Sequence, residues 1–188
     1  MEESNNDYLN RFGEKILKTK FCFEDGKTQN YSKGMERLYS FFIRCKEIGS
    51  KVIFIGNGGS AAIAMHMTAD FMKNGGLRTV SMYDSATITC LGNDYGYEYI
   101  FSKQIGRIAN SGDVLVAISS SGKSPNIVKA IQVARNVGVY VVTFTGFRED
   151  NIVNAMGNIG IYVPCEEYGI VESIHNLILQ QIVDRISE

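Results

Sequence analysis

The stretch Val114-Leu-Val-Ala-Ile-Ser-Ser-Ser-Gly-Lys-Ser-Pro125 runs from a continuous apolar segment into a serine-rich loop and then to a proline. Unbroken apolarity, without polar alternation, indicates a strand buried on both faces, as in a parallel sheet covered by helices. Pro125 suits the first turn of a helix, which makes Ser124 its expected N-cap. The segment therefore predicts a strand, a short loop and a helix, which together are the repeating unit of an α/β fold.

The same unit recurs on both sides of this stretch. Four further apolar runs are predicted as strands, at 51–55, 79–82, 139–144 and 159–163. Helices are predicted at 60–73, 85–92, 97–109, 124–137, 149–156 and 168–186, with two more within 6–49. This alternation predicts an α/β fold with a doubly wound, parallel, five-stranded sheet, in which ligands bind at the carboxyl ends of the strands.

Length and composition limit the class of protein. The 188 residues, 45% of them apolar, fit a single domain with a continuous core. A net charge of −1 gives no basic surface for nucleic acid or for a membrane. No apolar run is long enough to span a bilayer, and the acidic N-terminus does not resemble a signal peptide. Four cysteines without paired spacing predict reduced thiols in a cytoplasmic protein.

A second loop, Gly56-Asn-Gly-Gly-Ser60, also lies between a predicted strand and a predicted helix. Its glycines let the backbone turn sharply and approach a ligand, and the helix offers unpaired N–H groups to an anion. The spacing matches neither the dinucleotide fingerprint nor the P-loop. Glycines that only form a turn and serines that only cap a helix are the structural alternative. Because four serines exceed what a cap requires, the two loops favour a site for a phosphate monoester.

Five segments resemble, in order and spacing, the sugar isomerase (SIS) superfamily, and within it the bacterial phosphoheptose isomerases. These segments are Gly56–Ala62, Gly92–Asp94, Gly112–Leu115, Ile118–Ser124 and Thr143–Gly146. The resemblance implies a flavodoxin-like single SIS domain over 1–188, with an α/β core at 50–188 and an N-terminal helical segment, 1–49, used in oligomerisation. It also implies a homotetramer with active sites at subunit interfaces.

The same resemblance implies a sugar-phosphate isomerase. The expected reaction converts a ketose to an aldose, from sedoheptulose 7-phosphate to a heptose 7-phosphate, for the synthesis of surface-polysaccharide precursors. The serine loop would hold the phosphate, and the residues after Gly92 would meet the sugar hydroxyls. The substrate-binding residues implied are Asn57, Gly58, Ser60, Asn93, Asp94, Ser119, Ser120, Ser121, Ser124 and Gln180.

Isomerisation through an enediol needs groups that move protons between carbon and oxygen. The family places a His and a Glu four residues apart on the first core helix, and a Gln and a His eight residues apart on the last. The matching positions hold His66, Asp70, Glu172 and Gln180, so three of the four differ from the family pattern. We expect Asp70 and Glu172 to be the acid–base pair and His66 to orient or ligate. No cofactor is required, but all four side chains could ligate zinc or another divalent metal.

Two non-catalytic functions remain as alternatives. The segment His66-Met-Thr-Ala-Asp70 has the form found in a DnaA-associating replication regulator of the same superfamily. Glu172 argues against that alternative, because it looks like a replacement acid–base group. A sugar-phosphate sensor is the other alternative, although no DNA-binding module accompanies the domain. The remaining histidine, His175, is interpreted as a structural residue of the last helix.

Overall fold

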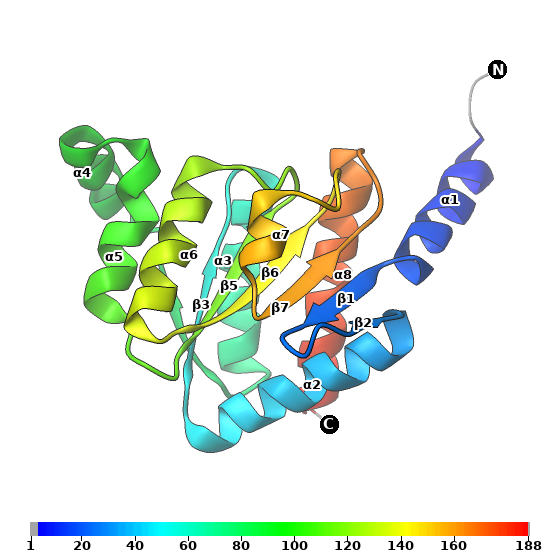
Figure 1. Cartoon of the computed structure of the whole chain (residues 1–188), viewed down its shortest axis with the longest axis horizontal. Helices are drawn as coiled ribbons and strands as arrows, with labels where there is room; N and C mark the ends of the chain where they lie inside the picture. Colours follow the sequence, from blue (N-terminus) through cyan, green and yellow to red (C-terminus); the bar gives the residue numbers. More distant parts are fainter. Residues whose placement is uncertain (1–3, 188) are drawn as a thin grey trace.

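One sheet of seven strands, in the order β2-β1-β7-β6-β5-β3-β4, runs through the computed structural model, which describes residues 4–187 (Figure 1). Five of its strands run parallel to one another: β3 (Lys51–Ile55), β4 (Arg78–Ser81), β5 (Val114–Ser119), β6 (Tyr140–Thr145) and β7 (Ile159–Tyr162). They match the five predicted strands to within two residues. The predicted α/β fold is confirmed.

Helices cover both faces of the sheet. One face carries α2 (Tyr31–Ile48), α3 (Gly59–Lys73) and α8 (Tyr168–Ser187), and the other carries α5 (Ile100–Ile108), α6 (Pro125–Val137) and α7 (Ile152–Met156). Beside α5 lie α4 (Ser85–Tyr95) and the short 3-10 helix η1 (Tyr97–Tyr99). Successive residues of β5 pack into the hydrophobic cores on opposite faces of the sheet: Val116 lies in the core under α8, and Leu115 lies in the core under α6. Burial on both faces explains why the strand reads as an unbroken apolar run.

The prediction of five strands misses a hairpin at one edge. Strands β1 (Lys20–Phe23) and β2 (Thr28–Gln29) lie in the segment expected to hold only helices, and β1 pairs antiparallel with β7. The strand is short and alternates, with Phe21 and Phe23 buried and their neighbours partly exposed. A half-buried strand of this length gives a weak apolar signal, which accounts for the error.

The N-terminal helix α1 (Asn5–Leu17) projects from the side of the molecule, next to β1 and the start of α8 (Figure 1). Ser4 and Asp7 form a capping box that begins it. None of its residues is buried; Phe12 and Ile16 pack on the core, whereas Leu9 and Leu17 remain exposed. Part of its apolar surface is therefore uncovered in the single chain. Among residues 4–187, no helix is long and apolar enough to cross a membrane.

Candidate active site

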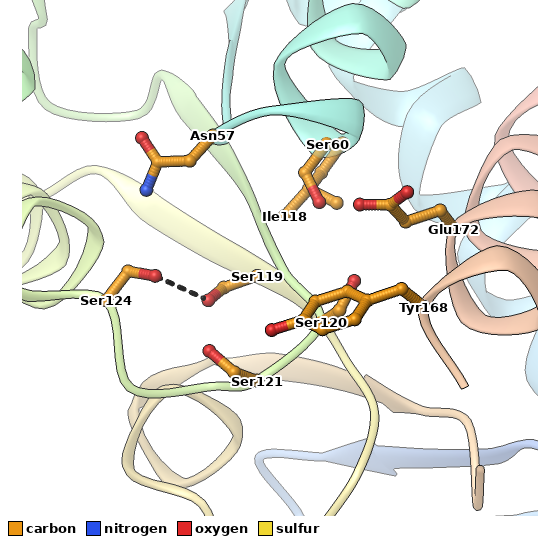
Figure 2. Close-up of a pocket in the computed structure, with 9 residues that line it drawn as sticks. All are labelled: Asn57, Ser60, Ile118, Ser119, Ser120, Ser121, Ser124, Tyr168 and Glu172. Carbon is orange, nitrogen blue, oxygen red and sulfur yellow. Dashed lines mark hydrogen bonds between the residues drawn. The ribbon is translucent and has the colours of Figure 1, made fainter. Parts of the chain in front are cut away.

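The two glycine- and serine-rich loops meet at one edge of the sheet. Strands β3 and β5 are parallel neighbours, with Val52 opposite Val114, so the loops that follow them emerge side by side. Between the loops and the start of α8 lies a pocket (Figure 2). Its lining consists of Asn57, Ser60, Ile118, Ser119, Ser120, Ser121, Ser124, Tyr168 and Glu172. Six predicted substrate contacts and one predicted catalytic residue are thus brought together.

The serine loop is turned toward this pocket rather than toward the helix it precedes. Ser124 is the N-cap residue of α6, but its side chain makes no capping hydrogen bond. Its hydroxyl instead lies 3.4 Å from the Ser119 hydroxyl, within the pocket. A serine that only capped the helix would bind a backbone N–H of the first turn. The arrangement therefore favours the ligand-binding interpretation of the loop.

The tight path of the loop depends on Gly122. Its φ is +65°, a left-handed conformation that favours glycine, and a Cβ there would lie 1.9 Å from Oδ1 of Asn151. Its carbonyl accepts a hydrogen bond from the N–H of Val153 at 3.0 Å. The loop is thereby fixed against the start of α7, which holds the serine hydroxyls in place before a ligand binds.

The side chain of Glu172, a residue of α8, lies against the N-terminus of α3. Its carboxylate accepts a hydrogen bond from the Ser60 N–H and lies so close to Gly59 that a Cβ there would be 2.3 Å from Oε2. Burial raises the pKa of Glu172, and the Ser60 N–H partly opposes that rise. A carboxylate whose pKa moves toward neutrality is better suited to exchange protons with a substrate. Glu172 is the predicted catalytic residue that this pocket contains.

His66 and Asp70 lie farther along α3, outside the residues that line the pocket. Their predicted position on one helical face is confirmed, since His66 Nε2 is 3.5 Å from Asp70 Oδ2. The rise of about 1.5 Å per residue places His66 roughly 10 Å along the helix from Gly59, the residue that Glu172 contacts. The His66 side chain is 53% exposed. Within one chain, the three predicted catalytic residues do not form a single cluster.

The predicted metal ligands are separated in the same way. Gln180 shares a groove with Glu172 between α3 and α8, and its amide donates to Asp184 at 3.0 Å. Zinc requires its ligands within about 2.3 Å of one ion. Over residues 4–187, no three His, Cys, Asp or Glu side chains are grouped to hold a metal. The four residues therefore do not fit a metal ion as a set within one chain.

The helix predicted at 85–92 extends further as α4, which continues through Asn93 and Asp94 to Tyr95. The helix ends at Gly96, whose φ of 94° favours glycine. Both side chains are exposed, and the Asn93 amide donates to Asp94 at 3.0 Å. Neither they nor Gly58, the N-cap of α3, is among the residues lining the pocket. Their contact with substrate stays a prediction.

Tyr168 is a pocket residue that the sequence analysis missed. It begins α8 one helical turn before Glu172, so the i, i+4 spacing from that residue could have identified it. Its ring packs edge-on against Phe147 at 4.7 Å. Phe147 has a φ of +59°, which is rare outside glycine, and its backbone is held by the Cys165 carbonyl and the Tyr162 hydroxyl.

His175 is fully buried behind this site. Its Nε2 lies 3.1 Å from the Thr145 carbonyl, and its ring packs edge-on against Phe144. Burial lowers the pKa of His175 to about 4, so the ring is neutral at physiological pH. These contacts agree with the structural role expected for this residue.

A match to the SIS domain model spans residues 24–146, about two thirds of the chain. The chain therefore belongs to the SIS domain family. Within that family it is similar to phosphoheptose isomerases. That of Helicobacter hepaticus is 34% identical over 158 residues, covering 81% of this chain and 80% of the relative. That of Fusobacterium nucleatum is 33% identical over 175 residues, covering 90% and 88%.

Solved structures show the same similarity. The phosphoheptose isomerase of Francisella tularensis superposes with a TM-score of 0.82 at 29% identity, covering 96% of this chain and 95% of that one. That of Neisseria gonorrhoeae gives a TM-score of 0.76 at 33% identity, covering 81% and 84%. The match to the Francisella structure, which covers 96% of this chain, includes most of the α1–β2 segment and α8.

Proposed function

We propose that this chain is a ketose–aldose isomerase that converts sedoheptulose 7-phosphate to a heptose 7-phosphate, in the supply of surface-polysaccharide precursors. The observation that carries the proposal is the position of Glu172, a partly desolvated carboxylate at the rim of a hydroxyl-lined pocket. The named relatives, which are phosphoheptose isomerases, support the same reaction. Unpaired thiols and a phosphorylated substrate fit a cytoplasmic location.

In this proposal the serine loop binds the phosphate group. The hydroxyls of Ser119, Ser121 and Ser124 surround the space that the phosphate would occupy. Hydroxyls and backbone N–H groups satisfy phosphate oxygens without a fixed cation. Lys123 is exposed and outside the pocket lining, so the binding would depend on neutral donors. The phosphate would then fix the sugar so that its carbonyl end faces α8.

Glu172 would act as the base. It takes a proton from the substrate carbon next to the ketone, the electron pair forms the enediol double bond, and the ketone oxygen gains a proton from water. The proton on the neighbouring hydroxyl is then lost to water as that oxygen becomes the aldehyde, and Glu172 returns the proton it took to the former ketone carbon. Atoms and charge balance without an external oxidant or reductant.

His66 and Asp70 would complete the site of a neighbouring copy in a homotetramer. Both lie beyond the pocket of their own chain, and the His66 side chain is half exposed. Exposed Met65 and Met72 on the same helix, with the uncovered apolar side chains of α1, supply surface for such an assembly. The segment 1–49 would take part in it. This arrangement explains why one chain alone does not assemble the predicted set.

A non-catalytic sugar-phosphate-binding protein is the second candidate. The observation that favours it is the amide at Gln180, which cannot exchange protons near neutral pH. The pocket would then bind a phosphate ester without turning it over. The DnaA-associating type and the sugar-phosphate sensor both belong to this class.

The two candidates are separated by mixing the purified protein with sedoheptulose 7-phosphate and following the aldose product by NMR. We expect turnover, and we expect Glu172→Gln to lower kcat by about 10²–10⁴-fold, the usual contribution of a general base. Glu47→Gln, which removes an exposed carboxylate on α2, is the matched control and should keep full activity. Binding of the sugar phosphate without turnover would contradict the proposal that the protein is an enzyme. An unaffected rate in Glu172→Gln would remove that residue from the mechanism.

A further inference from the structure

Two asparagines from different parts of the chain form a reciprocal pair at the pocket wall. Asn57 follows β3, and Asn126 is the second residue of α6. The Asn57 Nδ2 donates to Asn126 Oδ1 at 2.9 Å, and the Asn126 Nδ2 donates to Asn57 Oδ1 at 2.9 Å. Asn126 is only 1% exposed, whereas Asn57 lines the pocket. One member of the pair is therefore fixed in the protein interior, and the other faces the ligand.

The backbone decides which way both amides are turned. The N–H of Ile127 lies 3.0 Å from one side-chain atom of Asn126, and because a backbone N–H can only donate, that atom must be the carbonyl oxygen. The other end of the Asn126 amide is then its NH₂ group. The Asn57 atom facing that NH₂ group must accept, so it is Oδ1. The first turn of α6 thus sets the orientation of Asn57.

Tyr97 holds the Asn57 amide in place from a third element, η1. Its hydroxyl donates to Asn57 Oδ1 at 3.0 Å, so this oxygen accepts two hydrogen bonds and both of its lone pairs are used. The Asn57 Nδ2 has one N–H bound to Asn126 and one N–H left over. In Figure 2 this nitrogen is directed toward Ser124, and the oxygen is turned away from the serine loop.

The geometry points to Asn126 and Tyr97 as positioning residues that make Asn57 a hydrogen-bond donor to the phosphate of the ligand. A phosphate ester presents only acceptor oxygens, and N–H donors to a charged oxygen form strong hydrogen bonds. The opposite orientation would place the Asn57 carbonyl oxygen against the phosphate and repel it. The inference rests on the proposed function only in taking a phosphate ester as the ligand.

A double-mutant cycle on KM tests the inference. Asn126→Ala frees the Asn57 amide to rotate, and Tyr97→Phe removes one hydroxyl from an exposed side chain. We expect Asn57→Ala and Asn126→Ala each to raise the KM for sedoheptulose 7-phosphate about tenfold, with kcat little changed. Tyr97→Phe should raise it by a smaller factor. In the Asn57→Ala background, neither second substitution should raise KM further, because both act through Asn57.

Tyr95→Phe is the matched control, since it removes the hydroxyl of another exposed tyrosine nearby in the chain and should leave KM unchanged. Increases in KM that multiply in the double variants would overturn the inference. Thermal unfolding of each variant separates a loss of folded protein from a loss of positioning.

An NMR measurement on the ligand-free protein keeps the inference independent of the reaction. The side-chain amide protons of Asn57, assigned by their loss in Asn57→Ala, should exchange slowly with solvent in the wild type and faster in Asn126→Ala. Equal exchange rates in the two proteins would overturn the inference even if the enzyme is active. Slow exchange in a protein without turnover would support the amide pair while the proposed function fails.

Discussion

Replacing His175 by glutamine should remove a defined part of the protein's sensitivity to acid. The imidazole is fully buried on α8, its Nε2–H donates to the Thr145 carbonyl, and its Nδ1 has no partner among the described residues. A glutamine amide can reproduce the donor but cannot take up a proton. The substitution therefore tests ionisation with little change in volume or hydrogen bonding.

The magnitude follows from the change in pKa. Burial lowers the pKa of His175 from 6.5 to about 4, so the unfolded chain binds a proton between these values and the folded chain does not. The stability that the neutral ring contributes is present above pH 6.5 and is lost as the pH falls toward 4. At 1.36 kcal/mol per pH unit, the loss is about 3 kcal/mol. Below pH 4 this residue adds no further change.

Equilibrium urea unfolding, followed by circular dichroism at a fixed protein concentration, measures the effect across this pH window. The free energy of unfolding of the wild type should fall toward acid more steeply than that of His175→Gln, and the difference between the two should change by about 3 kcal/mol. Parallel pH dependences would refute the reasoning. If the variant does not fold, the ring resonances of His175 in the wild type give the answer, because they should show no titration above about pH 5.

Two further predictions concern the serine loop and a buried ion pair. Gly122→Ala should destabilise the fold by more than the roughly 1–2 kcal/mol cost of a left-handed residue, because the alanine Cβ would also displace Asn151. Thermal unfolding measures this loss of stability, and steady-state kinetics should show a raised KM because the serine loop is displaced. Gly26→Ala, with a φ of +72° and open space around it, carries only the backbone cost and is the control. Asp113 is 5% exposed and accepts hydrogen bonds from the backbone N–H groups of Lys51 and Asn110. Burial raises the pKa of Asp113, but these hydrogen bonds and the Lys51 ammonium, 2.5 Å away, outweigh burial and hold that pKa below its usual value. The Asp113 carboxylate therefore stabilises the fold at pH values above the usual Asp pKa, and this contribution is lost as the pH falls into the acid range. Asp113→Ala should cost about 2–4 kcal/mol in urea unfolding at neutral pH, and the exposed Asp150→Ala should cost much less; equal costs would contradict this account.

The parallel core of the fold could be predicted from the sequence because its strands are buried on both faces. Runs such as Val114–Ile118 lose all polar alternation, and their short length and β-branched residues favour a strand over a buried helix. The β1–β2 hairpin at the edge of the sheet follows a different pattern, in which buried and partly exposed residues alternate along β1. Its signal was Asp25-Gly26, a turn dipeptide between short segments, and Gly26 has the positive φ that such turns require.

The candidate site could be predicted where a loop carries the chemistry in consecutive residues. Ser119, Ser121 and Ser124 face one pocket because the loop that holds them follows a strand end. The site could not be predicted where distant elements cooperate. Tyr97 and Asn57 are 40 residues apart in the sequence, and only the folded chain brings their side chains together. The spacing of His66 and Asp70 predicts that they share one face of a helix, but it does not predict that this face lies away from Glu172.

The antiparallel pairing of β1 with β7 has a consequence for how the chain folds. Lys20 pairs with Tyr162, so the hydrogen bonds between β1 and β7 can form only after the long intervening segment has been synthesised. Such non-local contacts slow folding, because chain entropy is lost before the contact is gained. Until β7 pairs with it, the edge of β1 that faces β7 presents unpaired backbone N–H and C=O groups to other chains, a state prone to aggregation. We expect that step to be late on the folding pathway.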